Sequence, residues 1–358
     1  MNAKNWVTFK TRRRTLNQSE RRTDIKCFLN LSSSGVSSSD YLHGSRAAVR
    51  VHPAHPIFRP LEMEGGRKVT HIAVLKGAES QTPAETPWGA PLVWGDSRHS
   101  ASRRAKFAQR EIRIGLLAFV VGTYAQFIRR FLYSAETYFL PGQVVTYYIL
   151  TDNPRSLDPP VKLGPEREMK VIPIAELPGW ERLAHRRMTL LGDAIRESID
   201  SETDYIFCAD VDQEFVAPVR AEILGDLVAT LHPELYGMPR NAFPYEVDEG
   251  SSAYVEEDEG DFYYTSEFYG GAVSEMYKLA RGCSLLILQD HTDGITARGL
   301  EESYLNRYLI DHRPTCVLSP EYSWWDSDLD TAPLALWSAA IRVNRVSALF
   351  SPQWPIIN

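Results

Sequence analysis

Short apolar runs of strand length alternate with apolar residues at helical spacing through the middle of this 358-residue chain. The strand-like runs cover 114–121, 145–150 and 205–209, and the helical periods between them cover 125–135 and 190–199. A turn sequence, Thr-Asp-Asn-Pro, follows the second run, and acidic residues follow the third. Strands that alternate with helices of this length predict an α/β fold with a parallel-rich, doubly wound sheet.

The first 83 residues lack this pattern and are rich in Arg, Ser and Thr. We expect residues 1–83 to be a basic, largely disordered segment and residues 84–358 to form one folded domain. The cluster Arg12-Arg13-Arg14 is read as a solvated basic tail, with a nuclear or nucleic-acid signal as the alternative. No apolar run approaches the ~20 residues of a membrane helix, so no membrane anchor is expected in the chain as written.

Charge is distributed unevenly along the chain. Residues 1–70 hold 13 Lys and Arg against 5 Asp and Glu, whereas the whole chain has a net charge of −7 and a pI near 5.8. This acidic balance argues against a general nucleic-acid binder. The four scattered cysteines are too few for a disulfide framework or a zinc site.

Asp210 and Asp212 follow the strand-like run 205–209 directly. Residues two apart project to the same side of an extended chain, so both carboxylates can converge on one hard cation that keeps open positions for phosphate oxygens. Helix caps or solvated surface acids are the alternative reading. An EF-hand is excluded, because Phe215 and Ala221 stand where its Gly and Glu should be, and no phosphate-binding GxxxxGK[ST] or GxGxxG sequence is present.

A series of longer motifs spans roughly residues 85–340. They are TPWGAPLVW (87–95), IGLLAFVVGTYAQF (114–127), RRM (186–188), DVDQEF (210–215), LHPELYG (231–237), EGDFYY (259–264), FYGGAV (268–273), ESYLNRYL (302–309) and LSPEY (318–322). In this order and spacing they resemble the retaining glycosyltransferases of family 6, which include the histo-blood-group A and B transferases and α-1,3-galactosyltransferase. The resemblance implies a GT-A fold, in which a Rossmann-like nucleotide half with a mixed, mainly parallel sheet joins an acceptor half.

The resemblance also implies an activity. It is the Mn²⁺-dependent, retaining transfer of galactose or N-acetylgalactosamine from a UDP-sugar to a galactose-type glycan acceptor on a glycolipid or glycoprotein. The implied location is the Golgi lumen or membrane, no nucleic-acid partner is expected, and a homo-oligomer is left open. The alternative hypothesis is an impaired family member that binds UDP or glycan without turnover.

Site residues follow from the resemblance position by position. Asp210 and Asp212 match the metal ligands, and Glu302 matches the catalytic glutamate. Nucleotide binding is assigned to Phe119, Val120, Val121, Tyr124, Arg187 and Val211, and substrate binding to His232, Glu246, Ser266, Glu267, Glu301 and Asp326. From the residues alone, Val120 and Val121 also suit a core strand, a lone His is more often structural, and a first-turn Glu is an ordinary helix residue.

Several positions depart from the family pattern. Gly299 replaces an aromatic residue, and Leu300 and Glu301 replace the His-Asp that precedes the catalytic glutamate. Glu267 adds bulk and negative charge where relatives have a small or hydrogen-bonding residue. No Lys or Arg follows Arg345, although the family places cations there to cover the diphosphate. The alternative hypothesis of an impaired family member rests on these departures.

Overall fold

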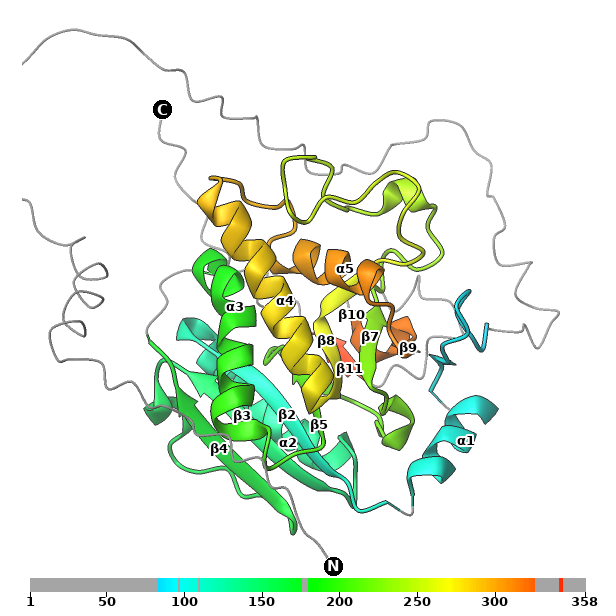
Figure 1. Cartoon of the computed structure of the whole chain (residues 1–358). Coiled ribbons are helices and arrows are strands. Elements are labelled where there is room, and N and C mark those ends of the chain that lie inside the picture. Colours follow the sequence, from blue (N-terminus) through cyan, green and yellow to red (C-terminus); the bar gives the residue numbers. More distant parts are fainter. Residues whose placement is uncertain (1–82, 96, 109, 176–179, 326–340, 344–358) are drawn as a thin grey trace, which may run out of the picture. The chain divides into compact units, whose positions relative to one another are not determined.

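An eight-stranded sheet organises the described part of the chain (Figure 1). The computed structural model describes residues 83–95, 97–108, 110–175, 180–325 and 341–343; residues 1–82 of the predicted N-terminal segment lie outside this part. In spatial order the strands are β1 (Leu92–Val93), β9 (Cys316–Leu318), β7 (Leu227–Leu231), β8 (Tyr264–Ala272), β5 (Tyr205–Ala209), β2 (Arg113–Val120), β3 (Val144–Thr151) and β4 (Arg167–Pro173). The three strands predicted from apolar runs are β2, β3 and β5.

The sheet is mainly parallel, as predicted, and β8 is the strand that makes it mixed. It runs antiparallel to both of its neighbours, β5 and β7, while the other pairings in the sheet are parallel. Gly271 allows this close fit, because its φ is +154° and a Cβ there would lie 2.3 Å from the carbonyl oxygen of Asp226. The close approach of the two chain segments therefore explains the second glycine of the FYGGAV motif, Gly271.

Helices cover both faces of the sheet. One face carries α3 (Trp180–Ala194), its π-helical extension η5 (Ile195–Ile199), α4 (Val273–Thr292) and α5 (Glu301–Asp311), and the other carries α2 (Ile128–Tyr138). In Figure 1, α3 and α4 lie side by side in front of the strands. Consecutive β2 residues pack into opposite layers, as the period of two in a strand requires.

Shorter elements complete the fold. A second sheet joins β10 (Trp324–Trp325), β11 (Ile341–Val343) and β6 (Gln213–Phe215). The remaining helices are α1 (Arg98–Phe107), η3 (Gly122–Phe127), η4 (Pro154–Leu157), η6 (Ala221–Ile223), η7 (Arg240–Ala242) and η8 (Pro320–Ser323). Within the described ranges, every helix is too short or too polar to cross a membrane.

Candidate active site

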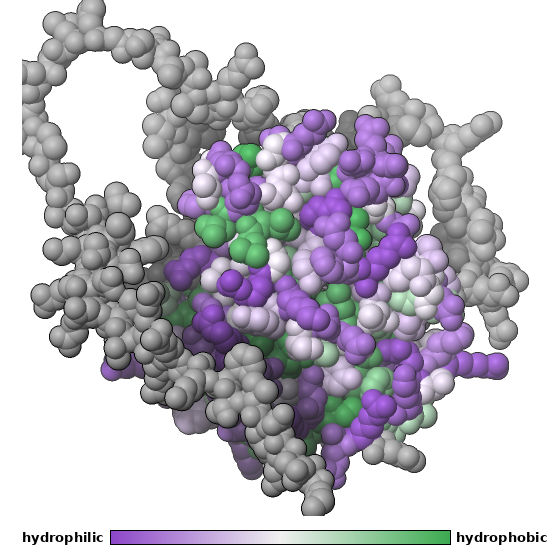
Figure 2. Space-filling view, viewed as in Figure 1, coloured by the Kyte–Doolittle hydropathy of each residue, from purple (hydrophilic) through white to green (hydrophobic). Residues whose placement is uncertain are grey.

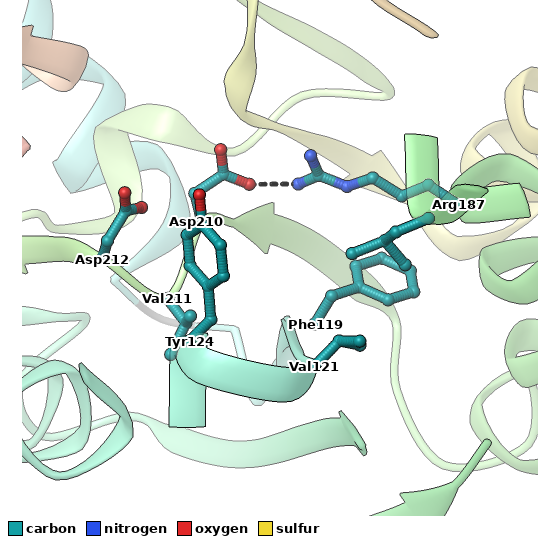
Figure 3. A pocket seen from close by; sticks show the side chains of 8 residues that line it. Phe119, Val121, Tyr124, Arg187, Asp210, Val211 and Asp212 are labelled. Carbon is teal, nitrogen blue, oxygen red and sulfur yellow. Dashed lines mark hydrogen bonds and ion pairs between the residues drawn. The ribbon is translucent and has the colours of Figure 1, made fainter. Parts of the chain in front are cut away.

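The two predicted metal ligands lie at the carboxyl end of β5, beside a pocket of about 110 Å³. The pocket is lined by Phe119, Val121, Tyr124, Leu183, Arg187, Asp210, Val211 and Asp212. Figure 3 shows that these side chains come from the end of β2, from η3, from α3 and from the loop after β5. Ligands of doubly wound sheets bind at this edge, because the polar ends of parallel strands meet there.

The pleat of β2 separates the predicted nucleotide-binding residues. Phe119 and Val121 face the layer of α3 and line the pocket, and Tyr124 follows them on η3. Val120 is fully buried against the layer that contains α2 and does not line the pocket. The side chain of Val120 is thus part of the core, which is the alternative reading that the apolar run left open.

Arg187 connects the aspartate pair to the start of α5. This side chain is 2% exposed and forms ion pairs with Asp210 and with Glu301, the second at 3.3 Å. It also lies over the Phe119 ring, 5.4 Å from its centroid. Burial alone would lower the pKa of Arg187, but its acidic neighbours, Asp210 foremost, raise that pKa overall, so the guanidinium stays charged.

The electrostatics of the pocket disfavour two free carboxylates. Burial, followed by repulsion from Asp210, raises the pKa of Asp212 to about 6. Burial also raises the pKa of Asp210, although Arg187 opposes this shift. Burial, followed by the negative charges of Asp212 and Asp210, raises the pKa of the Tyr124 phenol, which lines the same pocket (Figure 3). A divalent cation would relieve this repulsion.

The donor set fits such a cation. Asp210 and Asp212 supply hard carboxylate oxygens, which suit Mn²⁺ or Mg²⁺, and two protein ligands leave positions for phosphate oxygens. Among the residues that the structure describes, no group of three or more His, Cys, Asp and Glu side chains is arranged to hold a metal.

Glu302 lies in the first turn of α5 and is held against β8. One of its oxygens accepts hydrogen bonds from the Ser266 backbone N–H at 2.8 Å and from the Ser266 hydroxyl at 3.0 Å. Burial raises the pKa of Glu302, and these bonds from Ser266 oppose the shift. Asn306, one turn later, binds both backbone polar groups of Tyr264, at 2.9 and 2.8 Å, and so fixes α5 on β8.

The other predicted substrate residues lie on β8 and on neighbouring loops. The His232 ring lies edge-on to Tyr263, with 5.8 Å between centroids, and burial lowers its pKa to about 4. Glu267 accepts a 2.7 Å hydrogen bond from the buried Ser323 hydroxyl. Glu246 accepts hydrogen bonds from backbone amides of its own loop and of Arg298. Asp326 lies outside the described residues.

Sequence reasoning missed several residues that the structure brings to the site. Leu183 lines the pocket, and Ser323 bridges Glu267 and Gln213, accepting from the Gln213 amide at 3.2 Å. A polar residue that interrupts an apolar face, as Asn306 does on α5, was the available signal, since buried polar groups need partners.

Comparisons with known proteins identify the family of this chain. The family model for Glycosyltransferase family 6 matches residues 68–348. The human globoside alpha-1,3-N-acetylgalactosaminyltransferase 1 is 44% identical over 268 residues, which cover 75% of this chain and 77% of that protein. The rat histo-blood group ABO system transferase 2 is 40% identical over 70% of this chain and 75% of its own length, and the human alpha-1,3-galactosyltransferase 2 is 37% identical over 67% and 70%. This chain belongs to glycosyltransferase family 6 and is an enzyme that transfers a sugar from a donor to a glycan acceptor.

Proposed function

We propose that the chain transfers galactose or N-acetylgalactosamine, with retention, from a UDP-sugar to a galactose-type acceptor in a Mn²⁺-dependent reaction. The observation that carries this proposal is the continuous chain of charged contacts from Asp210 through Arg187 to Glu301. It joins the carboxylate pair to the helix turn that bears Glu302. One connected set of residues could therefore bind the diphosphate at Asp210 and Asp212 and place the carboxylate of Glu302 near the sugar.

The nucleotide side would use the pocket beside β5. Phe119, Val121 and Tyr124 offer an apolar and aromatic wall for a uracil ring. Asp210 and Asp212 would hold Mn²⁺, which would supply positive charge to a departing diphosphate. Arg187 orients Asp210 and balances part of the negative charge in the pocket.

The sugar side would use Glu302 and its neighbours on β8. Retention needs a carboxylate on the face of the anomeric carbon opposite the leaving group, where it attacks that carbon or stabilises positive charge on the ring. Ser266 fixes one oxygen of Glu302, so the carboxylate is oriented before substrate binds. His232 is neutral above about pH 4 and can hydrogen-bond an acceptor hydroxyl without adding charge.

Glu267 favours a second candidate, a family member that binds a nucleotide or glycan without turnover. Its carboxylate is fixed by Ser323 in the segment that the resemblance assigns to donor selection. An acidic group there would meet the donor sugar, and it would reject a bulky N-acetyl group by leaving a polar atom unpaired. If the chain does transfer a sugar, the same carboxylate makes UDP-galactose the better of the two donors.

One donor screen separates these candidates. UDP release is measured with UDP-galactose or UDP-N-acetylgalactosamine, with and without a β-galactoside, in Mn²⁺ or in excess chelator. Acceptor-dependent release that needs Mn²⁺ supports transfer, and Glu302→Gln should abolish it while UDP binding stays within about threefold. UDP binding without release would support the second candidate.

The variant Glu267→Ala should improve the use of UDP-N-acetylgalactosamine relative to UDP-galactose. An unchanged ratio of the two donors would show that Glu267 does not contact the donor sugar.

The Golgi lumen is the compartment that the proposed activity requires, since UDP-sugars and glycan acceptors meet there. Asn17 and Asn30 begin glycosylation sequons. The chain can be expressed in a secreting eukaryotic cell and treated with an N-glycosidase. Release of a glycan from either asparagine would support exposure of residues 1–83 to the lumen. Staining with a Golgi marker tests the location itself, and nuclear staining would contradict it.

A further inference from the structure

The turn that leads into α5 has a backbone conformation that suits glycine but carries leucine. Leu300 has φ +52° and ψ −132°, close to the second position of a type II′ turn. The Glu302 N–H closes this turn on the Gly299 carbonyl at 3.1 Å. Side chains with a Cβ are strained at such a position, and the glycine of this sequence stands one residue too early to relieve the strain.

This strained turn carries the two carboxylates that the site depends on. Glu301 continues from it to Arg187, and Glu302 to Ser266. A change in the turn would therefore move both contacts together. Strained conformations persist only where surrounding contacts hold them, so some part of the fold must stabilise the conformation of Leu300.

Glu246 provides such a contact from a distant part of the sequence. Its side chain is buried, and one oxygen accepts the backbone N–H groups of Val247 and Asp248 at 2.8 and 2.9 Å. The other oxygen accepts the N–H of Arg298, two residues before Leu300. Three backbone donors thus meet one carboxylate, and a carboxylate, which has acceptors only, is the side chain that can satisfy them all.

The loop that bears Glu246 is itself well anchored. Tyr245, Val255 and Tyr263 form a small apolar cluster of their own, against which Ile310 of α5 packs. Asp290 of α4 accepts the Ser252 backbone N–H from the same loop at 2.6 Å. In Figure 1 this loop lies above α5. Glu246 therefore joins a fixed loop to Arg298, the residue directly before the strained turn 299–302.

We propose that Glu246 is a positioning residue, which holds the turn 299–302 in its strained form and so aims Glu302. This inference rests on the proposed transferase function and assigns Glu246 a role without substrate contact. Its hydrogen bonds are made to the chain itself, in contrast to the acceptor contact that the family resemblance implies. The conformation of Leu300 makes the proposal testable, because glycine at that position would need no external support.

The central experiment compares Glu246→Gln with the double variant Glu246→Gln/Leu300→Gly. Glutamine keeps the size but turns one acceptor oxygen into a donor nitrogen, so at least one backbone N–H loses its partner. We expect kcat to fall about tenfold to hundredfold, with the acceptor KM within about threefold of the parent. Adding Leu300→Gly to Glu246→Gln should restore most of kcat. Adding Leu300→Ala instead should not restore kcat, because alanine keeps the strained Cβ, and this second double variant is the matched control.

A direct substrate contact would give the opposite pattern. If Glu246→Gln raises the acceptor KM and Leu300→Gly restores nothing, Glu246 binds the acceptor and the positioning role is wrong. If Glu246→Gln leaves both kcat and the acceptor KM unchanged, both roles are contradicted. If the glutamine variant fails to fold, recovery of folding by Leu300→Gly but not by Leu300→Ala supports the proposal, and recovery by neither contradicts it.

Hydrogen exchange makes the test independent of turnover. Backbone amides of residues 299–303 should exchange faster in Glu246→Gln and return to the parent rate in the double variant. If the parent protein shows no transfer with any donor, the proposed function fails, and this exchange pattern alone decides whether Glu246 holds the turn. Equal exchange in the parent and in Glu246→Gln would overturn the inference.

Discussion

Three carboxylates and one buried guanidinium meet where β5 ends and α5 begins. Asp210, Asp212 and Glu301 contribute three carboxylates, and Arg187 contributes one guanidinium that pairs with two of them. Buried charges cost folding free energy unless they are paired, and Asp212 has a repulsive neighbour in Asp210. An arrangement that weakens the fold in this way points to a function, and it suits the divalent cation of the proposed reaction.

Neutralising the two aspartates separately should have opposite effects on stability. Asp212→Asn removes a repelled charge, so in chelator it should raise the free energy of unfolding by on the order of 1 to 3 kcal/mol. Asp210→Asn removes the ion-pair partner of buried Arg187 and should lower it by a similar amount. Denaturant titrations measure both free energies of unfolding.

The variants Asp212→Asn and Asp210→Asn should also lose Mn²⁺-supported UDP binding in calorimetry. Retained binding in both variants would contradict the assignment of these aspartates as metal ligands.

His232 should make stability depend on pH. Its folded pKa of about 4 lies below the ordinary value of 6.5, so between these values the unfolded chain binds more protons. Stability therefore rises with pH across this range and is lost as pH falls from about 6.5 to about 4. Relative to His232→Gln, which does not titrate, the parent should lose about 1 to 3 kcal/mol between pH 7 and about pH 4.5. Parallel stability curves for the two proteins would show that the imidazole is not protected from protonation.

Among the elements, those with a simple apolar pattern were the predictable ones. The strands β2, β3 and β5 are buried on both faces, so their sequences are nearly continuous apolar runs with clear ends. The strand β8 was not predicted as a strand, because Thr265, Ser266 and Glu267 interrupt its apolar pattern and serve the site instead. The sequence likewise located Asp210 and Asp212 at a strand end, but it could not reveal that Glu246 is occupied by backbone amides from two loops.

Gly271 in β8 should be far less replaceable than a glycine in an open turn. In Gly271→Ala the new Cβ would lie 2.3 Å from a backbone oxygen of the neighbouring segment, which cannot move without separating β8 from β7. We expect a loss of roughly 3 kcal/mol or more. Gly142→Ala is the control, because Gly142 also has a positive φ, +79°, but open space around its Cβ. It should cost only about 1 kcal/mol. Equal losses in thermal unfolding would mean that backbone strain, and not the close strand approach, decides the cost.

At the scale of the whole molecule, the aspartate pair is supported by segments far apart in the sequence. Strand β6 begins directly after Asp212 and pairs antiparallel with β11 in three residue pairs, Gln213 with Val343, Glu214 with Arg342 and Phe215 with Ile341. The Ser134 hydroxyl of α2 accepts the Phe215 N–H at 3.1 Å. Local sequence patterns cannot predict such pairing, because three-residue strands carry too little periodicity and their partners lie more than a hundred positions away.

Removal of β11 should therefore weaken nucleotide binding through the loss of its pairing with β6. Two shortened chains isolate the effect, one ending at residue 343 and one at residue 340, since they differ only in the residues of β11. Loss of β11 leaves β6 without its described strand partner, and each backbone hydrogen bond contributes about 1 kcal/mol. We expect UDP affinity in Mn²⁺ to be about tenfold lower in the shorter chain, by calorimetry. If both chains bind UDP equally while the shorter one unfolds at lower temperature, β11 stabilises the fold but does not position Asp212.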